Sequence, residues 1–244
     1  MMKKNQNNEK KFSQQMKEMQ KELEELRREL EREKEMRRLG QLELLQVQVD
    51  PHFLYNTLDA IVWLVEAGKQ QEAVEMLSQL SLFFRIALSK GQDIIRLKEE
   101  IDHTRSYMNI QRMCYGDSMD YEIVLPKELE EIRLPKLTIQ PLVENALYHG
   151  TREKRGKSKI RIICSEQGED VLIAVEDNGR GMEPKQKVKL EKALQKGGRV
   201  GFGLTAVHER VKLYFGKEYG VKVDSEYGKG TRVEVRFSKE IRGV

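Results

Sequence analysis

The spacing of apolar residues changes once along the chain, near residue 115, and this change limits the fold more than any other feature. Before it, apolar side chains recur every three or four residues, which is the period of an amphipathic helix. After it, short runs rich in valine and isoleucine alternate apolar and polar side chains, as half-buried strands do. The chain is therefore predicted to be an α+β multidomain protein, helical in its first part and α/β in its second.

The N-terminal segment carries a helical stripe of apolar side chains. Its members are Met16, Met19, Leu23, Leu26 and Leu30. Spacings of three and four in a charged segment predict a coiled-coil helix over residues 1–49, with weaker seam positions near residue 40. A solvated single helix is the alternative that this pattern leaves open.

Two amphipathic segments between residues 50 and 91 predict a helical hairpin. Asp50 suits the cap and Pro51 the first turn of its first helix, and Gly68 is expected to end that helix. The second helix is expected from about Gln71 to Gly91. The apolar faces are too wide to be buried within one hairpin, so pairing with a second copy in a four-helix bundle is expected.

Helices and strands alternate in the rest of the chain. A third helix is expected over residues 97–115. Strands are expected over residues 121–125, 159–164, 171–175 and 231–237, with helices near 135–149 and 203–214 between them. A hairpin-like pair of strands is expected around residues 228–230. This order predicts an α/β sandwich, in which one sheet carries helices on one face.

Composition excludes several partners and sites. Charged residues make up 34% of the 244 residues, but the formal net charge is only +4, so no nucleic-acid partner is predicted. Cys114 and Cys164 lie far apart without metal-ligand spacing, and reduced thiols in a cytosolic setting are expected. No stretch approaches the roughly 18 apolar residues that a membrane-spanning helix needs.

Four motifs follow one another along the chain. They read Asp50-Pro51-His52-Phe53-Leu54-Tyr55-Asn56, Leu142-Val143-Glu144-Asn145-Ala146-Leu147-Tyr148-His149-Gly150, Asp177-Asn178-Gly179-Arg180-Gly181 and Gly201-Phe202-Gly203-Leu204. Together they resemble the LytS/YesM-type sensor histidine kinases over about residues 40–237. The resemblance implies a coiled-coil signalling helix over residues 1–49, a dimerisation and histidine phosphotransfer domain over 50–115, and an ATP-binding domain of the Bergerat (GHKL) fold over 116–244.

The resemblance also implies a nucleotide pocket. Asn145 and His149 are four residues apart and share one helix face. By resemblance, Asn145 holds the Mg²⁺ that bridges the phosphates of ATP, and His149 lies near those phosphates. Asp177 would accept a hydrogen bond from the adenine amino group, and Thr231 would help to hold adenine through water.

Glycines are expected to shape this pocket. Gly179 and Gly181 permit positive φ and a close approach of backbone to ligand. Gly201 and Gly203 precede a helix whose first amides can face a phosphate. No Gly-Lys-Ser/Thr follows, which excludes the Walker type of phosphate loop. The lysine-rich residues 185–199 are expected to form a mobile basic lid that attracts the nucleotide.

His52 matches the phosphoacceptor of the family, and neutral imidazole is a good nucleophile near pH 7. Phe53 follows it, where many relatives carry an acidic residue that orients the imidazole. Glu144 and Asp59 are therefore the candidates for this acidic role, and Asn56 is expected to place the water that dephosphorylates a partner protein.

The resulting hypothesis is a homodimeric two-component sensor kinase. It would move a phosphoryl group from Mg-ATP to His52 and then to an aspartate in the receiver domain of a response regulator. The chain is expected to be the cytoplasmic portion of a membrane receptor attached upstream, with a soluble kinase as an open alternative. A GHKL-type ATPase clamp is a second functional alternative, although Pro141 stands where those ATPases carry a water-activating glutamate. A nucleotide-sensing scaffold or a phosphatase of a response regulator is the third.

Overall fold

The computed structural model describes Glu24 and residues 51–87, 93–150, 156–196 and 202–241. The chain divides into two compact units, Met1–Asp50 and Pro51–Val244. Glu24 is helical, and the rest of the expected coiled coil lies outside the described residues. No helix within the described ranges combines the length and the apolar character needed to cross a membrane.

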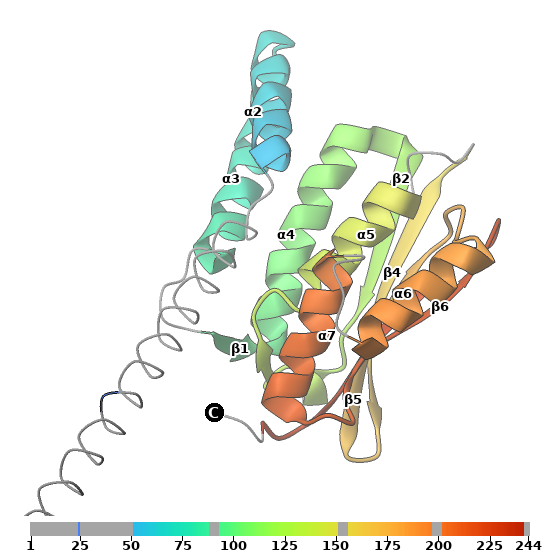
Figure 1. Ribbon diagram of the computed structural model, residues 1–244. Helices are drawn as coiled ribbons and strands as arrows, with labels where there is room; N and C mark the ends of the chain where they lie inside the picture. The colour runs from blue at the N-terminus through green and yellow to red at the C-terminus, as the bar shows by residue number, and fades with distance from the viewer. Residues whose placement is uncertain (1–23, 25–50, 88–92, 151–155, 197–201, 242–244) are drawn as a thin grey trace, which may run out of the picture. The chain divides into compact units, whose positions relative to one another are not determined.

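Helices and strands of the second unit follow the order expected from the sequence (Figure 1). The helices are α2 (Pro51–Glu66), α3 (Gln70–Ala87), α4 (Leu97–Tyr115), α5 (Gln140–Gly150), α6 (Pro184–Lys196) and α7 (Phe202–Phe215). The strands are β1 (Ile94–Arg96), β2 (Met119–Val124), β3 (Arg133–Pro135), β4 (Ser158–Gln167), β5 (Asp170–Asp177), β6 (Gly220–Glu226) and β7 (Gly230–Ser238).

Helices α2 and α3 form the expected hairpin, and Gly68 lies in the turn between them. Gly68 has φ +73°, a conformation that a residue without a β-carbon adopts at little cost. The N–H groups of Gly68 and Lys69 donate to the carbonyls of Val65 (3.0 Å) and Leu64 (2.8 Å), which closes the end of α2. The prediction that α2 ends at this glycine is confirmed.

One side of the hairpin is buried and the other is not. Phe53, Leu64 and Phe83 face the interior, where α3 packs against α4. Large apolar side chains lie exposed on both helices: Tyr55, Leu58, Val62, Trp63, Val65, Val74 and Leu77. These seven residues are called the apolar hairpin face below.

The second half of the unit is an α/β sandwich, so the predicted fold class is confirmed. Its sheet has the order β2-β4-β5-β7-β6, with β2 parallel to β4 and every other pair antiparallel. Helices α5, α6 and α7 cover one face of this sheet (Figure 1). Strands β1 and β3 form a separate antiparallel pair that the sequence did not reveal.

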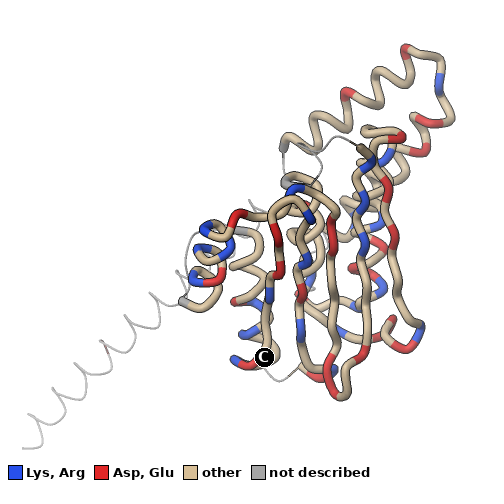
Figure 2. Tube along the Cα trace, turned by 90° about the vertical axis from the view of Figure 1, so that its right-hand side faces the viewer, with Lys and Arg blue, Asp and Glu red and all other residues tan. Residues whose placement is uncertain are grey.

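The two faces of the sheet differ in chemistry. Alternate residues of each strand, such as Ile173 and Val175 in β5, are buried on the helix-covered face. On the open face, charged side chains align in register across all five strands: Glu122, Arg161, Glu176, Arg232 and Asp224. The sign of the charge alternates from strand to strand along this row, and Figure 2 shows basic and acidic residues on neighbouring strands of the sheet.

Two expectations differ from the structure in detail. The helix expected from about residue 135 begins at Gln140, because Arg133–Pro135 pairs with β1 and Leu137 adopts a positive φ of 58°, which no helix accommodates. The lysine-rich part of the expected lid is helix α6, whose Lys187 forms an ion pair with Asp224 at 2.9 Å. Residues 197–201 of that lid lie outside the described residues.

Candidate active site

His52 lies exposed in the first turn of α2, and its neighbours explain its orientation. Phe53 is buried, with its ring centroid 5.1 Å from that of Phe83 and 4.9 Å from that of Tyr107. Because adjacent residues of a helix point about 100° apart, burying Phe53 against α3 and α4 turns His52 outward. The phenylalanine that stands in place of an acidic residue is thus a packing anchor.

The side chain of Asn56 contacts the imidazole directly. Its Nδ2 lies 3.1 Å from Nδ1 of His52, four residues earlier on the same helix face. An amide can present either nitrogen or oxygen to a ring nitrogen, so this contact can serve either neutral tautomer of His52. Asp59 lies exposed nearly one turn further along α2.

The end of β5 and the start of β7 bring two predicted nucleotide residues together. Asp177 follows the same alternation as the buried Val175, so its side chain lies on the helix-covered face of the sheet. Thr231 is its partner in register on β7. Oδ1 of Asp177 accepts a hydrogen bond from the backbone N–H of Gly179 at 2.8 Å.

Glycine is required at two positions near Asp177: in the turn that follows β5 and at the start of β7. Gly181 has φ +67°, and a β-carbon there would overlap the carbonyl oxygen of Glu226. Gly230 has φ +114°, and a β-carbon there would overlap the carbonyl oxygen of Asp177. The expectation of positive φ is therefore confirmed for Gly181. It is wrong for Gly179, whose N–H instead closes a turn onto the Asp177 carboxylate.

Ser225 is a residue of this region that the sequence motifs missed. Its hydroxyl accepts a hydrogen bond from the N–H of Met182 (2.8 Å) and lies 2.8 Å from Oγ1 of Thr231. A signal for it exists in β6, where Val221, Val223 and Ser225 alternate on the helix-covered face. A polar residue that continues an apolar alternation marks the place where a strand leaves the core.

Asn145 lies beside the first turn of α7. Its Nδ2 donates to the carbonyl of Pro141 at 2.6 Å, so Oδ1 is the atom suited to a hard cation. A β-carbon at Gly203 would lie 3.1 Å from Cβ of Pro141 and 3.5 Å from Nδ2 of Asn145. The glycine thus permits the start of α7 to lie close to α5 and Asn145. The N–H groups at the start of a helix favour an anion.

Three further residues are predicted for this site: Glu144, His149 and Gly201. Glu144 is half-buried, and its Oε1 accepts a hydrogen bond from Nε2 of Gln140 at 3.0 Å. The side chain of His149 and the whole of Gly201 lie outside what the structure describes. Within the described ranges, no group of three or more histidine, cysteine, aspartate or glutamate side chains could hold a metal ion by itself.

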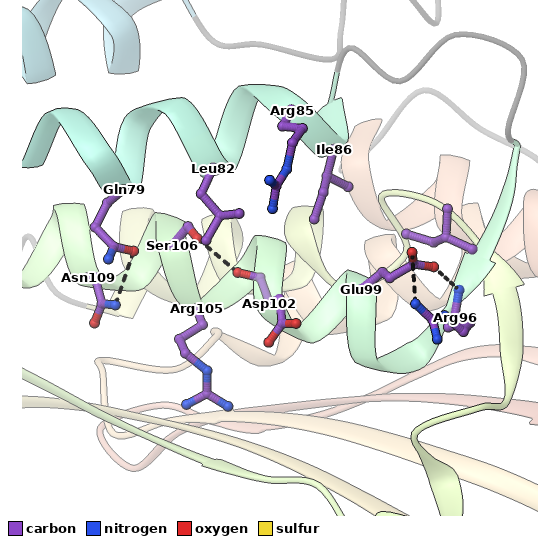
Figure 3. Close-up of a pocket in the computed structure, with 11 residues that line it drawn as sticks. Gln79, Leu82, Arg85, Ile86, Arg96, Glu99, Asp102, Arg105, Ser106 and Asn109 are labelled. Atoms are coloured by element: carbon purple, nitrogen blue, oxygen red, sulfur yellow. Dashed lines mark hydrogen bonds and ion pairs between the residues drawn. The ribbon is translucent and has the colours of Figure 1, made fainter.

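A separate hollow of about 680 Å³ lies between α3 and α4 (Figure 3). The hydrogen bond from Asn109 to Gln79 (3.3 Å) crosses it, and the Arg96–Glu99 ion pair (3.4 Å) lies at its β1 end. None of the nucleotide residues predicted from the sequence lines it. It therefore belongs to the packing of the hairpin against α4.

Two family models match the chain. The model described as "Histidine kinase" covers residues 40–119, and the model described as "Histidine kinase-, DNA gyrase B-, and HSP90-like ATPase" covers residues 130–241. Together they span the hairpin with His52 and the sandwich with Asn145, Asp177 and Thr231.

Curated relatives agree with both models. Sensor histidine kinase YesM of Bacillus subtilis is 37% identical over 195 residues, which are 80% of this chain and 33% of the relative. Sensor histidine kinase BtsS of Escherichia coli K12 is 31% identical over 84% of this chain and 35% of its own length. Sensor protein LytS of Streptococcus mutans is 33% identical over 85% and 36%. The chain thus spans about a third of the length of these relatives, and it belongs to the LytS/YesM type of sensor histidine kinases.

Proposed function

We propose that this chain is the kinase portion of a two-component sensor, which transfers the γ-phosphoryl group of Mg-ATP to His52 and then to an aspartate of a response regulator. One observation carries the proposal. Asp177 and Thr231 on neighbouring strands, and Asn145 beside the start of α7, lie on the same helix-covered side of one sheet, although they are far apart in sequence. A nucleotide needs such an arrangement, with a polar site for its base and an anion site for its phosphates.

The base would be selected by Asp177. A carboxylate on the covered face accepts a hydrogen bond from the amino group of adenine, whereas guanine would present a carbonyl oxygen to the same acceptor and leave both unpaired. The absence of a β-carbon at Gly181 and Gly230 permits close approach of the backbone there. Adenine nucleotides are therefore the expected substrates.

The phosphates would lie between Asn145 and the first turn of α7. Mg²⁺ would supply positive charge that neutralises the phosphates during transfer. Oδ1 of Asn145 is the protein ligand proposed for it. The N–H groups of the first turn of α7, with His149 and Gly201 beside them, would hold the remaining phosphate oxygens.

The acceptor nitrogen would be Nε2 of His52. Nδ2 of Asn56 lies 3.1 Å from Nδ1 of His52, and a flip of this amide would present its oxygen to Nδ1 instead. With that oxygen accepting the proton of Nδ1, the lone pair of Nε2 would be free to attack phosphorus. We assign the acidic partner of the histidine to Glu144, which stands next to the magnesium ligand and arrives with the nucleotide. The exposed Asp59 is the alternative. Asn56 would also place water for the reverse, dephosphorylating reaction on the regulator.

The apolar hairpin face supports a homodimer. Seven large apolar side chains exposed on α2 and α3 would be buried if two hairpins formed a four-helix bundle. We assign dimerisation and phosphotransfer to residues 50–115 and nucleotide binding to residues 116–244. The regulator's receiver domain would then meet His52 on the cytoplasmic side of a receptor that is attached to the membrane upstream.

Incubation with γ-labelled ATP tests the proposal. The wild-type chain should gain a label that is stable in alkali and labile in acid, and His52→Gln should gain none. Glu144→Gln should slow labelling by about 100-fold, as expected for misplacement of the attacking imidazole, and Asp59→Asn should leave the rate within about twofold. Label that persists in His52→Gln contradicts the site assignment. Steady ATP hydrolysis without a phosphoprotein would instead favour the ATPase clamp, and phosphate removal from a regulator without labelling would favour the phosphatase.

A further inference from the structure

Glu100, in the first turn of α4, is a buried carboxylate that the proposed chemistry does not use. Its exposed fraction is 0%, and both of its oxygens accept backbone hydrogen bonds. Oε2 accepts from the N–H of Leu137 at 2.9 Å, and Oε1 accepts from the N–H of Ile139 at 2.8 Å. Burial raises the pKa of Glu100, while these N–H groups and the charge of Arg210 lower it.

The backbone that Glu100 holds has an unusual conformation. Leu137 has φ +58°, and among the described residues it is the one residue other than glycine in the left-handed region. A residue with a β-carbon keeps this conformation only where its surroundings enforce it. Arg210 of α7 holds the same turn from its other side, because its Nη1 donates to the carbonyls of Lys136 (2.8 Å) and Leu137 (3.5 Å).

This turn leads directly into the nucleotide site. The carbonyl of Ile139 accepts from the N–H groups of Leu142 (3.0 Å) and Val143 (3.1 Å), which makes it the first acceptor of α5. Pro141, in the same first turn, packs against Gly203 and accepts the side-chain hydrogen bond of Asn145. The position of residues 136–139 therefore sets the position of the first turn of α5 against α7.

We propose that Glu100 is a positioning residue, which fixes the turn before α5 and so places Asn145 for the magnesium-bound phosphates. This proposal rests on the proposed function, since it assumes that Asn145 acts as the magnesium ligand. The assignment needs a carboxylate with two acceptor oxygens. Glutamine at this position would turn its NH₂ group toward one of the two backbone N–H groups, and that buried donor would lose its partner.

Nucleotide binding by the full chain separates positioning from general stability. The affinity for ADP is measured with Mg²⁺ and with chelator, for the wild type, Glu100→Gln and Glu99→Gln. Glu99 is the matched control, because it is the neighbouring carboxylate of α4 and pairs on the surface with Arg96 (Figure 3). Magnesium should strengthen ADP binding in the wild type and in Glu99→Gln. In Glu100→Gln the increase in ADP affinity caused by Mg²⁺ should be about tenfold smaller, while the affinity without Mg²⁺ stays within about twofold of the wild type. Phosphorylation of His52 should be at least about tenfold slower, as misplacement of a catalytic group implies.

The results distinguish failure of the positioning role from failure of the proposed function. If folded Glu100→Gln keeps the wild-type magnesium gain, or loses affinity equally with and without magnesium, the positioning role is wrong. If the wild type itself binds no ADP or forms no phosphohistidine, the proposed function fails instead. Should circular dichroism show Glu100→Gln to be unfolded, Arg210→Lys tests the other side of the turn. It should lower the magnesium gain by about threefold, as loss of one ordinary hydrogen bond implies, and an unchanged gain would overturn the proposal.

Discussion

The hairpin and the sandwich differ in how completely they bury their large apolar side chains. In the sandwich the largest apolar side chains, such as Phe215 and Phe237, are 0% exposed between the sheet and its helices. In the hairpin, Tyr55 and Trp63 are 66% and 61% exposed. At about 25 cal/mol for each Å² of apolar surface removed from water, two helices that expose such side chains gain little from folding alone. The sandwich thus completes its core within one chain, whereas the hairpin leaves seven large apolar side chains exposed, and a partner surface is expected to cover them.

Helix α4 contacts both regions. Its His103 stacks on Phe83 of α3, with ring centroids 4.4 Å apart and an interplanar angle of 18°. Three residues earlier, Glu100 reaches the turn before α5. Helix α4 therefore contacts both the hairpin and the turn that leads into the proposed nucleotide site, so substitutions in α4 can affect either region.

A charge on the apolar hairpin face should have the largest effect. Trp63→Glu should raise the dimer dissociation constant by about 100-fold or more, because loss of a buried interfacial tryptophan typically costs about 2 to 4 kcal/mol. Leu213→Glu is the control, since Leu213 is 75% exposed on α7 of the sandwich. Sedimentation over a range of protein concentrations measures both. A wild-type chain that stays monomeric, or a Trp63→Glu dimer of unchanged affinity, would remove the contrast between the two regions.

Acid should weaken the contact between α3 and α4. Both ring nitrogens of His103 are buried without a hydrogen-bond partner, and burial lowers its pKa to about 4. The folded state therefore binds this proton less readily than the unfolded state, whose pKa is near 6.5. Stability from the neutral ring is fully present above about pH 6.5 and is lost as the pH falls toward 4, with a loss of about 2 kcal/mol by about pH 5.

His103→Phe should remove this dependence while keeping the stack on Phe83. The free energy of unfolding is measured with urea at about pH 7 and at about pH 5. The decrease between the two pH values should be about 2 kcal/mol smaller in the variant than in the wild type. Some dependence of the same sign should remain, because burial and the charge of Lys212 also lower the pKa of His208. An identical difference in the variant and the wild type would show that His103 is not the titrating group.

The open face of the sheet should show the smallest effect. Glu176 pairs with Arg161 at 3.5 Å and with Arg232, in the middle of the charged row. These side chains are partly exposed, so Glu176→Gln should lower the free energy of unfolding by only about 0.5 kcal/mol. The loss should shrink further in about 1 M salt. A loss of several kcal/mol that salt does not change would mean that this face is covered, which would weaken the contrast with the hairpin.

Local patterns predicted most of the elements, and their failures have a physical cause. Gly68 ends α2 as predicted, and the helix predicted over residues 97–115 is α4. The helix predicted from about Pro135 begins at Gln140, because Pro135 belongs to the strand that pairs with β1 and Leu137 adopts a positive φ. A pairing between segments almost forty residues apart leaves no periodic signal in either of them.

Some residues of the candidate site belong to sequence motifs, and others can be recognised only from their contacts in the structure. Motifs named Asp177, Asn145 and Gly203, since each belongs to a short run with its own composition. Ser225 and Glu100 belong to no motif, and their roles depend on partners elsewhere in the chain: Thr231 and Met182 for the serine, Leu137 and Ile139 for the glutamate. A single buried carboxylate in an amphipathic helix looks, in sequence, like any solvated one.

The sequence by itself determined the change from helices to an α/β sandwich and the family, and it predicted the residues that meet ATP, because periodicity and motifs are local properties of the chain. Only the tertiary structure decided which side chains share a site, how Phe53 turns His52 outward, and which carboxylate holds the turn before α5. The physical reason is that register and packing are set by contacts between distant segments, whose free energy exists only when the whole unit is assembled.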